Sequence, residues 1–521
     1  MRARSGVLGL LVLSLLLGLF LGACQSPSAE EQALMRDVEG EERPRGPEDG
    51  LLRLPLLEGQ VRSLDPLAIE SATELLIYRQ LWRGLAYLTE GEEAGIKAQL
   101  ASSIQTSDAG LSWQIDLDPE ARWSDGQPIR AADLLRSWQE RLRILEEAKA
   151  AGQRLNLMAE RALGPLIQAE FHYGEEAQRD QKEPLEAQED TPPRVRVAEG
   201  GRRILVQFPK AQPSFDKLLT WPVYDPQPPA EGLYSAAFCV EGQVPRDAAG
   251  WAQTGELRLR PNPQTAGNSS IKGLNFYVYK QSEQAWEAYR QGKLALIGEP
   301  LCPLPQQQKS QLAGYPGFRN QSSLFFSALY FPQGQSGPLA DWTDLPELLL
   351  AATERERLGP STRHDASQPY GGTESLTLEA KKALEARFAE GLELRNLKVE
   401  KLEPLLVFSP SEETGFLETR AVVKDWMSRY RLPIHLQQRE GLRASPWDSR
   451  SAAGEQAWAL RLELALFGPA EAEPQAYDEE LTAGRLLPLL QLSQAQCVQP
   501  WLDLGGEGPR GLLDFARCSF R

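Results

Sequence analysis

One segment of this chain, residues 99–134, constrains the fold more tightly than any other. Apolar and polar side chains alternate from Leu111 to Leu117, which is typical of a strand with one buried face. A tight turn is predicted at Ser124-Asp125-Gly126, because glycine accepts the backbone angles that such turns require. A helical pattern then runs from Ala131 to Lys149. This order of elements favours a mixed α/β fold.

The chain from Leu51 onward shows the same mixture of elements. Short apolar runs separated by turn residues predict further strands, among them Arg202–Phe208. Helical patterns recur at Glu283–Gln291 and Leu376–Glu390, and a polar, acidic surface loop is predicted from Tyr173 to Pro193. With 521 residues, 41% of them hydrophobic, the chain can bury enough apolar surface for two or three lobes.

The N-terminus has the features of a secretion signal with a lipid-attachment site. Arg2 and Arg4 precede an apolar stretch, Val7–Gly22, which has the length of a signal peptide rather than of a membrane span. The stretch leads into Leu21-Gly22-Ala23-Cys24, which resembles a bacterial lipoprotein signal with Cys24 as the lipidated first residue of the mature protein. The alternative is an ordinary secretory peptide in which Cys24 has no role. Acyl chains on Cys24 would hold the protein on a membrane.

The residues after Cys24 predict a flexible tether. Gln25–Gly50 is rich in Glu, Pro, Gly and Ser and has few large apolar residues, so it cannot bury enough surface to offset the entropic cost of ordering. A coil of about 26 residues would have a reach of roughly 30 Å. The tether would therefore hold the folded part of the protein away from the membrane.

Charge and motif content limit the partners and the kinds of site. The formal net charge is −16, from 72 acidic and 56 basic residues, so nucleic acid and anionic membrane surfaces would be repelled. The sequence has no phosphate-binding loop, nucleophile motif or metal-ligand spacing, which argues against an enzyme, a metal site and a cofactor. Four cysteines besides Cys24 allow two disulfides, with three pairings open: Cys239, Cys302, Cys497 and Cys518.

Two stretches carry a resemblance to a known family. The first is Ser63-Leu64-Asp65-Pro66 followed, after a predicted helix, by Leu81-Trp82-Arg83-Gly84-Leu85. The second is the ordered series Gln99–Ser103, Asp108–Leu117, Trp123–Ile129 and Ala131–Leu134. In this order and spacing they resemble the extracytoplasmic solute-binding proteins of family 5, which are the oligopeptide- and dipeptide-binding lipoproteins of ABC importers.

Weaker similarities follow in the family's order. Gly232–Tyr234 resembles a Gly-x-Tyr strand, Leu257–Pro263 resembles a strand with an Asn-Pro turn, and Leu486–Leu490 resembles the closing strand. Only Asp478–Arg485 stands where the family usually has a longer helical region. The chain is therefore identified as a divergent member with a shortened C-terminal lobe.

The resemblance implies an α/β architecture of two lobes, the periplasmic-binding-protein type II fold of cluster C and the peptide-binding subclass, with an extra domain and a hinge. The implied divisions are 1–23 for the signal peptide, 24–50 for the tether, 51–73 plus 219–300 plus 486–521 for lobe I, 74–218 for the extra domain (domain II) and 301–485 for lobe II. The lobes of such proteins close on a ligand like jaws.

The resemblance also implies a function: capture of peptides or similar small solutes in the interlobe cleft and delivery to an ABC-type permease. Such a receptor would be a monomer in the periplasm or at the cell surface, anchored through Cys24. The positions implied to contact the ligand are Glu70, Ser71 and Ala72 in lobe I and Phe467, Gly468 and Glu471 in lobe II.

One departure from the family leaves a second interpretation open. The Asp that neutralises a peptide's ammonium group would fall at Ala470, so Glu471 or Glu473 would have to supply the charge. Pro469 also removes a backbone donor from this loop. The alternative is a receptor-like scaffold or sensory lipoprotein that has lost peptide capture.

Overall fold

The protein is described here by a computed structural model that covers residues 46–520 with gaps. The residues outside the described part are 1–45, 90–94, 152–155, 174–190, 199, 243–249, 251–254, 266–269, 306–311, 313–316, 333–338, 340–341, 343–344, 354–367, 370–376, 411–412, 440–456, 466–485, 506–512 and 521. The signal peptide, Cys24 and most of the tether therefore lie outside the described residues. Most of the loop predicted after Tyr173 lies outside them as well.

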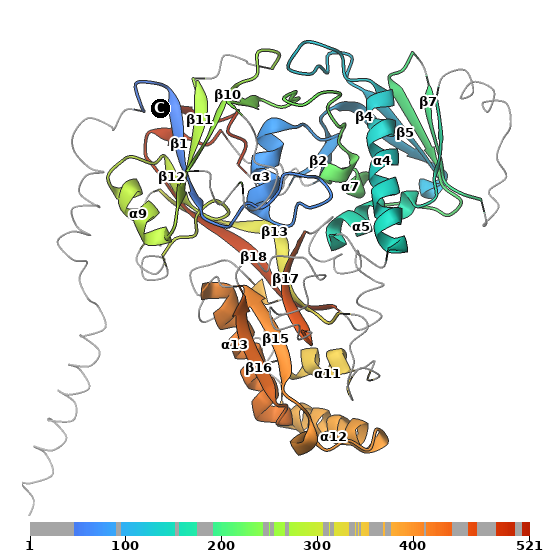
Figure 1. The fold of residues 1–521 in the computed structure, drawn as a ribbon, viewed down its shortest axis with the longest axis vertical. Coiled ribbons are helices and arrows are strands. Elements are labelled where there is room, and N and C mark those ends of the chain that lie inside the picture. Colours follow the sequence, from blue (N-terminus) through green and yellow to red (C-terminus); the bar gives the residue numbers. More distant parts are fainter. Residues whose placement is uncertain are drawn as a thin grey trace, which may run out of the picture. The chain divides into compact units, whose positions relative to one another are not determined.

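A four-stranded sheet with the order β1-β11-β10-β9 opens the fold (Figure 1). Its strands are β1 (Leu51–Leu57), β9 (Phe238–Val240), β10 (Glu256–Pro261) and β11 (Gly273–Tyr279). β1 runs parallel to β11, while β10 is antiparallel to both β11 and β9. Helix α3 (Ala72–Leu81) contacts β9, and helix α9 (Ser282–Arg290) contacts β11. The predictions of a strand near Leu257 and of a helix at Glu283–Gln291 are confirmed.

The strands of the segment at residues 99–134 lie in a five-stranded sheet with the order β4-β5-β8-β7-β6. Its strands are β4 (Ala101–Ser107), β5 (Ser112–Leu117), β6 (Glu170–His172), β7 (Arg194–Ala198) and β8 (Arg203–Gln207). In β5 every second side chain is buried, as predicted: Trp113, Ile115 and Leu117. The short helices of this region are η2 (Asp108–Gly110), α5 (Leu157–Leu163), η3 (Gly164–Leu166), α7 (Phe215–Leu218) and η5 (Pro222–Tyr224).

The predicted turn and helix of the same segment are also present. Gly126 has a φ of +87°, the positive value that a side chain would disfavour. Helix α4 (Ala131–Ala150) begins two residues before Asp133, whose carboxylate accepts a 2.9 Å hydrogen bond from the amide of the N-cap residue Arg130. A small hairpin of β2 (Ala86–Thr89) and β3 (Gly95–Ala98) precedes β4.

A seven-stranded sheet contains the two longest strands of the fold, β13 (Phe318–Tyr330) and β18 (Leu486–Val498). Its order is β12-β18-β13-β17-β15-β16, and β14 also pairs with β18. The other strands are β12 (Leu296–Gly298), β14 (Gln368–Pro369), β15 (Leu405–Pro410), β16 (Ile434–Arg439) and β17 (Ala459–Ala465). β13 and β18 run antiparallel over their whole length, with register shifts near their middle.

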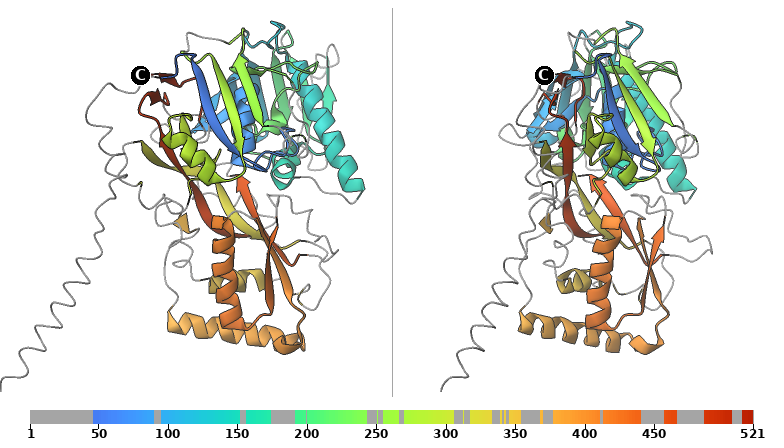
Figure 2. Two further views of the ribbon diagram at one scale, coloured as in Figure 1. Left: turned by 60° about the vertical axis from the view of Figure 1, so that its left-hand side comes forward. Right: turned by 90° about the vertical axis from the view of Figure 1, so that its left-hand side faces the viewer.

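Three helices accompany this sheet: α11 (Leu345–Ala352), α12 (Leu378–Leu394) and α13 (Glu413–Tyr430). Figure 2 shows α13 lying along β15 and β16, and α11 contacts both α12 and α13. The short helix η9 (Val399–Lys401) precedes β15. The chain ends in a two-stranded sheet of β19 (Leu502–Asp503) and β20 (Ser519–Phe520).

Buried apolar side chains form three clusters. The largest joins the four-stranded and five-stranded sheets and one side of the seven-stranded sheet, including Tyr330, Leu462 and Leu486. A second lies among α11, α12, α13 and the other side of that sheet. A third packs α9 against β12 and the end of β18. The seven-stranded sheet is therefore buried on both sides in this region, which accounts for apolar runs such as Leu486–Leu490 in β18.

One predicted strand is absent. Gly232 ends a turn, with a φ of +81°, and Leu233 and Tyr234 have no regular secondary structure. The backbone here pairs with the Ser124-Asp125-Gly126 turn instead of with a sheet: the Ser124 amide donates to the Tyr234 carbonyl at 2.8 Å. Among the described residues, no helix has the combination of length and hydrophobicity that crossing a membrane requires.

Candidate ligand-binding site

Three of the predicted ligand contacts, Glu70, Ser71 and Ala72, lie at the start of α3. Ser71 is the N-cap residue, and its hydroxyl accepts a 3.2 Å hydrogen bond from the amide of Glu74. The Oε2 atom of Glu74 in turn accepts hydrogen bonds from the amides of Glu70 at 2.8 Å and of Ser71 at 3.1 Å. This is a capping box, which satisfies amides that the first helical turn leaves without partners.

The same Glu74 carboxylate fixes a second stretch of backbone. Its Oε1 atom accepts hydrogen bonds from the amides of Arg62 at 2.9 Å and of Ser63 at 3.4 Å. The side chain is 1% exposed, so four amides surround a buried carboxylate. Glu74 therefore holds the family-like Ser63–Pro66 loop against the start of α3.

These contacts decide which backbone groups of the segment remain available. The amides of Glu70 and Ser71 are occupied by Glu74, and the carbonyl of Ile69 accepts a 2.8 Å hydrogen bond from the side chain of Asn156. The amide of Ala72 has no hydrogen-bond acceptor in the described part of the chain, and Ala72 is half-buried. Ala72 therefore offers a backbone donor at the positive end of a helix.

The start of α3 is tied to the strands of the seven-stranded sheet through Glu299 and Pro300. The hydroxyl of Thr73 donates to the Pro300 carbonyl. The side chain of Gln496 in β18 donates to the Glu299 carbonyl at 2.6 Å, and the Glu299 carboxylate accepts a 3.0 Å hydrogen bond from the Ala495 amide. The segment at residues 70–73 and the end of β18 are therefore parts of one connected polar region.

Polar side chains on β13 and β18 are buried with unmet hydrogen-bonding capacity. Ser327 is 0% exposed, Gln494 is 3% exposed and Gln496 is 1% exposed. Within the described residues, the Ser327 hydroxyl, both amide atoms of Gln494 and the Oε1 atom of Gln496 make no hydrogen bond. Buried polar groups are normally satisfied, so these atoms are candidates for hydrogen bonds with water, with a ligand or with residues outside the described part of the chain. No local sequence pattern marks these three residues.

The predicted contacts in lobe II cannot be placed in the same way. Phe467, Gly468 and Glu471 lie outside the described residues, together with Ala470 and Glu473. The strands before and after these residues in the chain, β17 and β18, lie on either side of β13, the strand that carries Ser327.

The aromatic side chains in this part of the fold are buried and pack in the hydrophobic core. Trp458 is 7% exposed and packs edge-on against Trp426 and Phe331, at ring distances of 6.2 and 5.2 Å. Trp113, Trp123 and Trp138 are also buried, as expected for the family-like segment.

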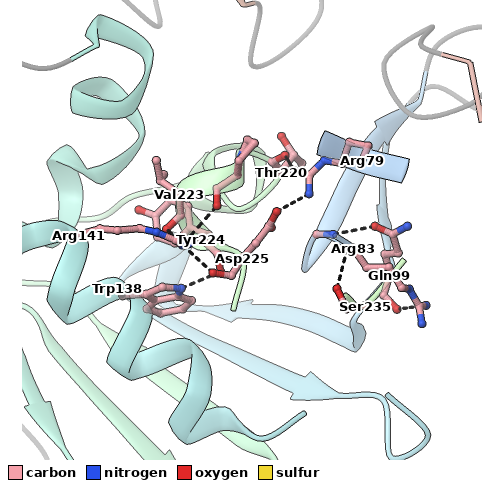
Figure 3. A network of polar contacts seen from close by, with 12 residues as sticks. Arg79, Arg83, Gln99, Trp138, Arg141, Thr220, Val223, Tyr224, Asp225 and Ser235 are labelled. Carbon is pink, nitrogen blue, oxygen red and sulfur yellow. Dashed lines mark hydrogen bonds and ion pairs between the residues drawn. The ribbon is translucent and has the colours of Figure 1, made fainter. Parts of the chain in front are cut away.

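A buried ionic network connects α3 to α4 beside this site (Figure 3). Asp225 is 0% exposed and forms an ion pair with Arg79 of α3, whose guanidinium also donates to the Thr220 carbonyl at 2.8 Å. Arg141 of α4 donates to the carbonyls of Val223 at 2.7 Å and of Asp225 at 2.6 Å. Burial raises the pKa of Asp225 to about 6, against the opposing effect of the two arginines. The network fixes the end of α3 relative to α4.

The four cysteines are buried, and none of the disulfides that the sequence allows is formed in the structure. Cys239 and Cys518 belong to the largest apolar cluster, while Cys302 and Cys497 belong to the cluster around α9. Burial raises the pKa of the Cys302, Cys497 and Cys518 thiols to about 12, so these thiols stay protonated and unreactive near neutral pH. Over the described residues, no group of three or more His, Cys, Asp or Glu side chains could hold a metal ion.

Comparison with known proteins finds a family with a similar sequence. Residues 95–343 match the model for the middle part of the bacterial extracellular solute-binding proteins, family 5. Among curated proteins, the probable deoxycholate-binding periplasmic protein YgiS of Escherichia coli is 24% identical over 263 residues, 48% of this chain and 44% of YgiS. The dipeptide-binding protein of Lactococcus lactis is 22% identical over 375 residues, 69% of this chain and 59% of that protein. The chain thus spans less than two thirds of the length of these curated relatives.

Solved structures extend the likeness over almost the whole chain. The Haemophilus influenzae OppA complex with the peptide RPPGFSPFR has a TM-score of 0.65 and 16% identity, with 91% of this chain and 99% of that chain covered. At this identity the likeness shows the fold, which is the two-lobed, mixed α/β architecture of periplasmic peptide-binding proteins, as the sequence predicts. The family-model match over residues 95–343 and this fold agree with each other: the chain is similar to the bacterial extracellular solute-binding proteins of family 5.

Proposed function

We propose that this protein is a receptor that captures peptides, or small solutes of similar chemistry, between two lobes and delivers them to an ABC-type permease. The observation that carries the proposal is the set of polar atoms near the start of α3 and on β13 and β18. The Ala72 amide, the Ser327 hydroxyl and the Gln494 amide have no partner among the described residues. A peptide main chain supplies both the acceptors and the donors that such atoms need.

We assign the residue ranges and the ligand contacts of each lobe from the resemblance to the family. Lobe I would comprise residues 51–73, 219–300 and 486–521, domain II residues 74–218, and lobe II residues 301–485. Ala72 would pair with the ligand in lobe I, while the amides of Glu70 and Ser71 support the helix start. Phe467, Gly468 and Glu471 would complete the site from lobe II. Closure would bring the two sets of contacts together, since a ligand favours the state in which it makes more contacts.

The anchoring of the receptor is part of the same proposal. Lipidation of Cys24 would keep the protein at a bacterial membrane, in the periplasm or at the cell surface, as a monomer. A tether over residues 24–50 would let the folded part reach a permease in the same membrane.

Mass spectrometry of molecules released from the freshly purified full-length chain tests the proposal. We expect short peptides in the released fraction, and a lower yield from Gln494→Leu, which removes both unmet amide atoms at similar volume. Gln291→Leu is the matched control, because Gln291 is exposed at the end of α9. Release of non-peptide solutes alone would contradict peptide capture. Absence of any bound molecule, together with absence of peptide binding in titrations, would favour the scaffold interpretation.

A further inference from the structure

A cavity of about 310 Å³, apart from the proposed peptide contacts, lies where the end of α3 meets the C-terminal segment of the chain. Its polar lining comes from Arg79, Gln80, Arg83, Gln99, Thr265 and Asp514. None of these residues is among the proposed peptide contacts. Cavities that bind small molecules begin at roughly 300 Å³. The space is therefore sufficient for a small molecule and too small for a peptide of several residues.

The first unmet group at this cavity is the side-chain oxygen of Gln80. Gln80 is 3% exposed, and its Nε2 atom donates to the carbonyls of Leu76 at 3.3 Å and of Leu513 at 3.1 Å. These two bonds fix the orientation of the amide. Its Oε1 atom accepts no hydrogen bond from any described residue. A buried acceptor of this kind needs a donor from water or a ligand.

The second unmet group is the guanidinium of Arg83 (Figure 3). Its Nη2 atom donates to the Gln99 carbonyl at 2.9 Å, and Nε and Nη1 donate to no described residue. Burial lowers the pKa of Arg83 and the nearby Asp118 opposes this effect, so the guanidinium is partly desolvated. Nε and Nη1 lie on different edges of the guanidinium, so a carboxylate would be held in a fork by one of them together with the second hydrogen of Nη2.

The other charged side chains of the cavity already have partners. Arg79 is paired with Asp225 and the Thr220 carbonyl. The Asp514 carboxylate lies 3.2 Å from Arg517 and accepts a 3.1 Å hydrogen bond from the Ala516 amide. The cavity thus combines one available cationic fork at Arg83, one available acceptor at Gln80, and a carboxylate at Asp514 that would favour a nearby cationic group.

We propose that this cavity is a second binding site, for a small zwitterion of the size of a single amino acid. The ligand's carboxylate binds the free edge of Arg83, and its ammonium group donates to Gln80 Oε1 close to Asp514. The cavity holds roughly ten water molecules at about 30 Å³ each, which leaves room for a free amino acid with a small side chain. This site is independent of the proposed peptide site, because it uses other residues and another part of α3.

Isothermal titration of the full-length chain tests the site with four probes: glycine, alanine, acetate and methylammonium. We expect saturable binding of the amino acids, with acetate and methylammonium at least tenfold weaker. Arg83→Gln should weaken alanine binding at least tenfold and Arg83→Lys less, because lysine keeps the charge without the fork. Arg202→Gln is the matched control, since Arg202 is exposed on the turn before β8.

A second variant separates recognition of the ligand's ammonium group by Gln80 from recognition of its carboxylate by Arg83. Gln80→Leu should reduce the preference for alanine over acetate, while acetate binding is retained. Circular dichroism of each variant verifies that the fold is intact. Failure of the wild type to bind any amino acid saturably, or equal alanine binding by Arg83→Gln and the wild type, would overturn the proposal. Peptides that bind between the lobes should leave alanine binding unchanged, so the two sites can fail separately.

Discussion

Among single side chains, Glu74 has the largest structural influence on the proposed peptide site. Its carboxylate accepts amide hydrogen bonds from two separate stretches, the Ser63–Pro66 loop and the start of α3. The sequence carried a signal for this role: Ser71-Ala72-Thr73-Glu74 has the spacing of a capping box. The family resemblance instead directs attention to Ser71 as a ligand contact. The local pattern indicates that Ser71 serves the helix.

Glu74→Ala should lower the free energy of unfolding by about 3–5 kcal/mol, because it leaves buried amides without acceptors. Glu74→Gln should cost roughly half as much, since one carbonyl oxygen remains. Urea denaturation measures both values, with the exposed Glu287→Ala as control. If Glu74→Ala were no more destabilising than the control, the assigned role of this carboxylate would be wrong.

Asp225 gives a second prediction about a single side chain. Removing its charge leaves Arg79 without its buried partner, so Asp225→Ala should cost about 3–5 kcal/mol of stability. The pH dependence has a definite sign. The native pKa of about 6 lies above the ordinary 3.8, so the native state takes up a proton as the pH falls from about 6 toward 4. Over this range the wild type should gain stability relative to Asp225→Asn.

Denaturation curves of the wild type and Asp225→Asn at pH 7, 6, 5 and 4 measure this difference. If the stability difference stayed constant with pH, or if the wild type lost stability relative to Asp225→Asn as the pH falls, the pKa of Asp225 would not be raised in the native state. The ion pair joins residues 146 positions apart. Because no local pattern links such distant positions, the pair could not be predicted from the sequence.

At the level of strands and helices, the antiparallel pair of β12 and β18 is closely packed around one glycine. Gly298 has a φ of +137°, and a Cβ atom there would lie 2.1 Å from the Ala495 carbonyl oxygen. Gly298→Ala should therefore cost roughly 2–4 kcal/mol, from a strained backbone and overpacking together. Gly292 is the matched control, because it has a φ of +71° with open space around its Cα.

Thermal or urea unfolding of Gly298→Ala and Gly292→Ala measures the two costs. We expect about 1 kcal/mol for the control, from the backbone term alone. Equal effects of the two substitutions would show that contact with β18 does not determine the identity of residue 298.

The elements differ in how well the sequence predicted them, and the reason is the range of the interactions involved. The segment at 99–134 was predictable because alternation, a glycine turn and a helix start are all local patterns. The prediction of a strand at Gly232–Tyr234 was wrong because hydrogen bonds to Ser124, more than a hundred positions away, determine the backbone conformation there. Gln494 and Ser327 were missed because their importance depends on burial within a sheet, which their own neighbours do not specify.

At the level of the two-lobed protein, the fold class and the family were predicted correctly, because the family-like segment lies inside the part that matches the family model. The ligand contacts could be predicted only where the family's ligand-contacting positions have counterparts in this sequence. Ala72 keeps an available donor, whereas the amides of Glu70 and Ser71 are occupied. The cavity at the end of α3 had no signal in the sequence, since its lining comes from stretches far apart in the chain.

The central claim is that this protein binds peptides in its native state, and stability in the presence of peptides tests it most directly. A peptide at 100 times its Kd should raise the free energy of unfolding of the full-length chain by about 2.7 kcal/mol, because only the folded state binds it. Denaturation with and without a library of short peptides of mixed sequence and length gives this value. We predict stabilisation by part of the library, reduced in Gln494→Leu and retained in Gln291→Leu. No stabilisation by any peptide would contradict the account.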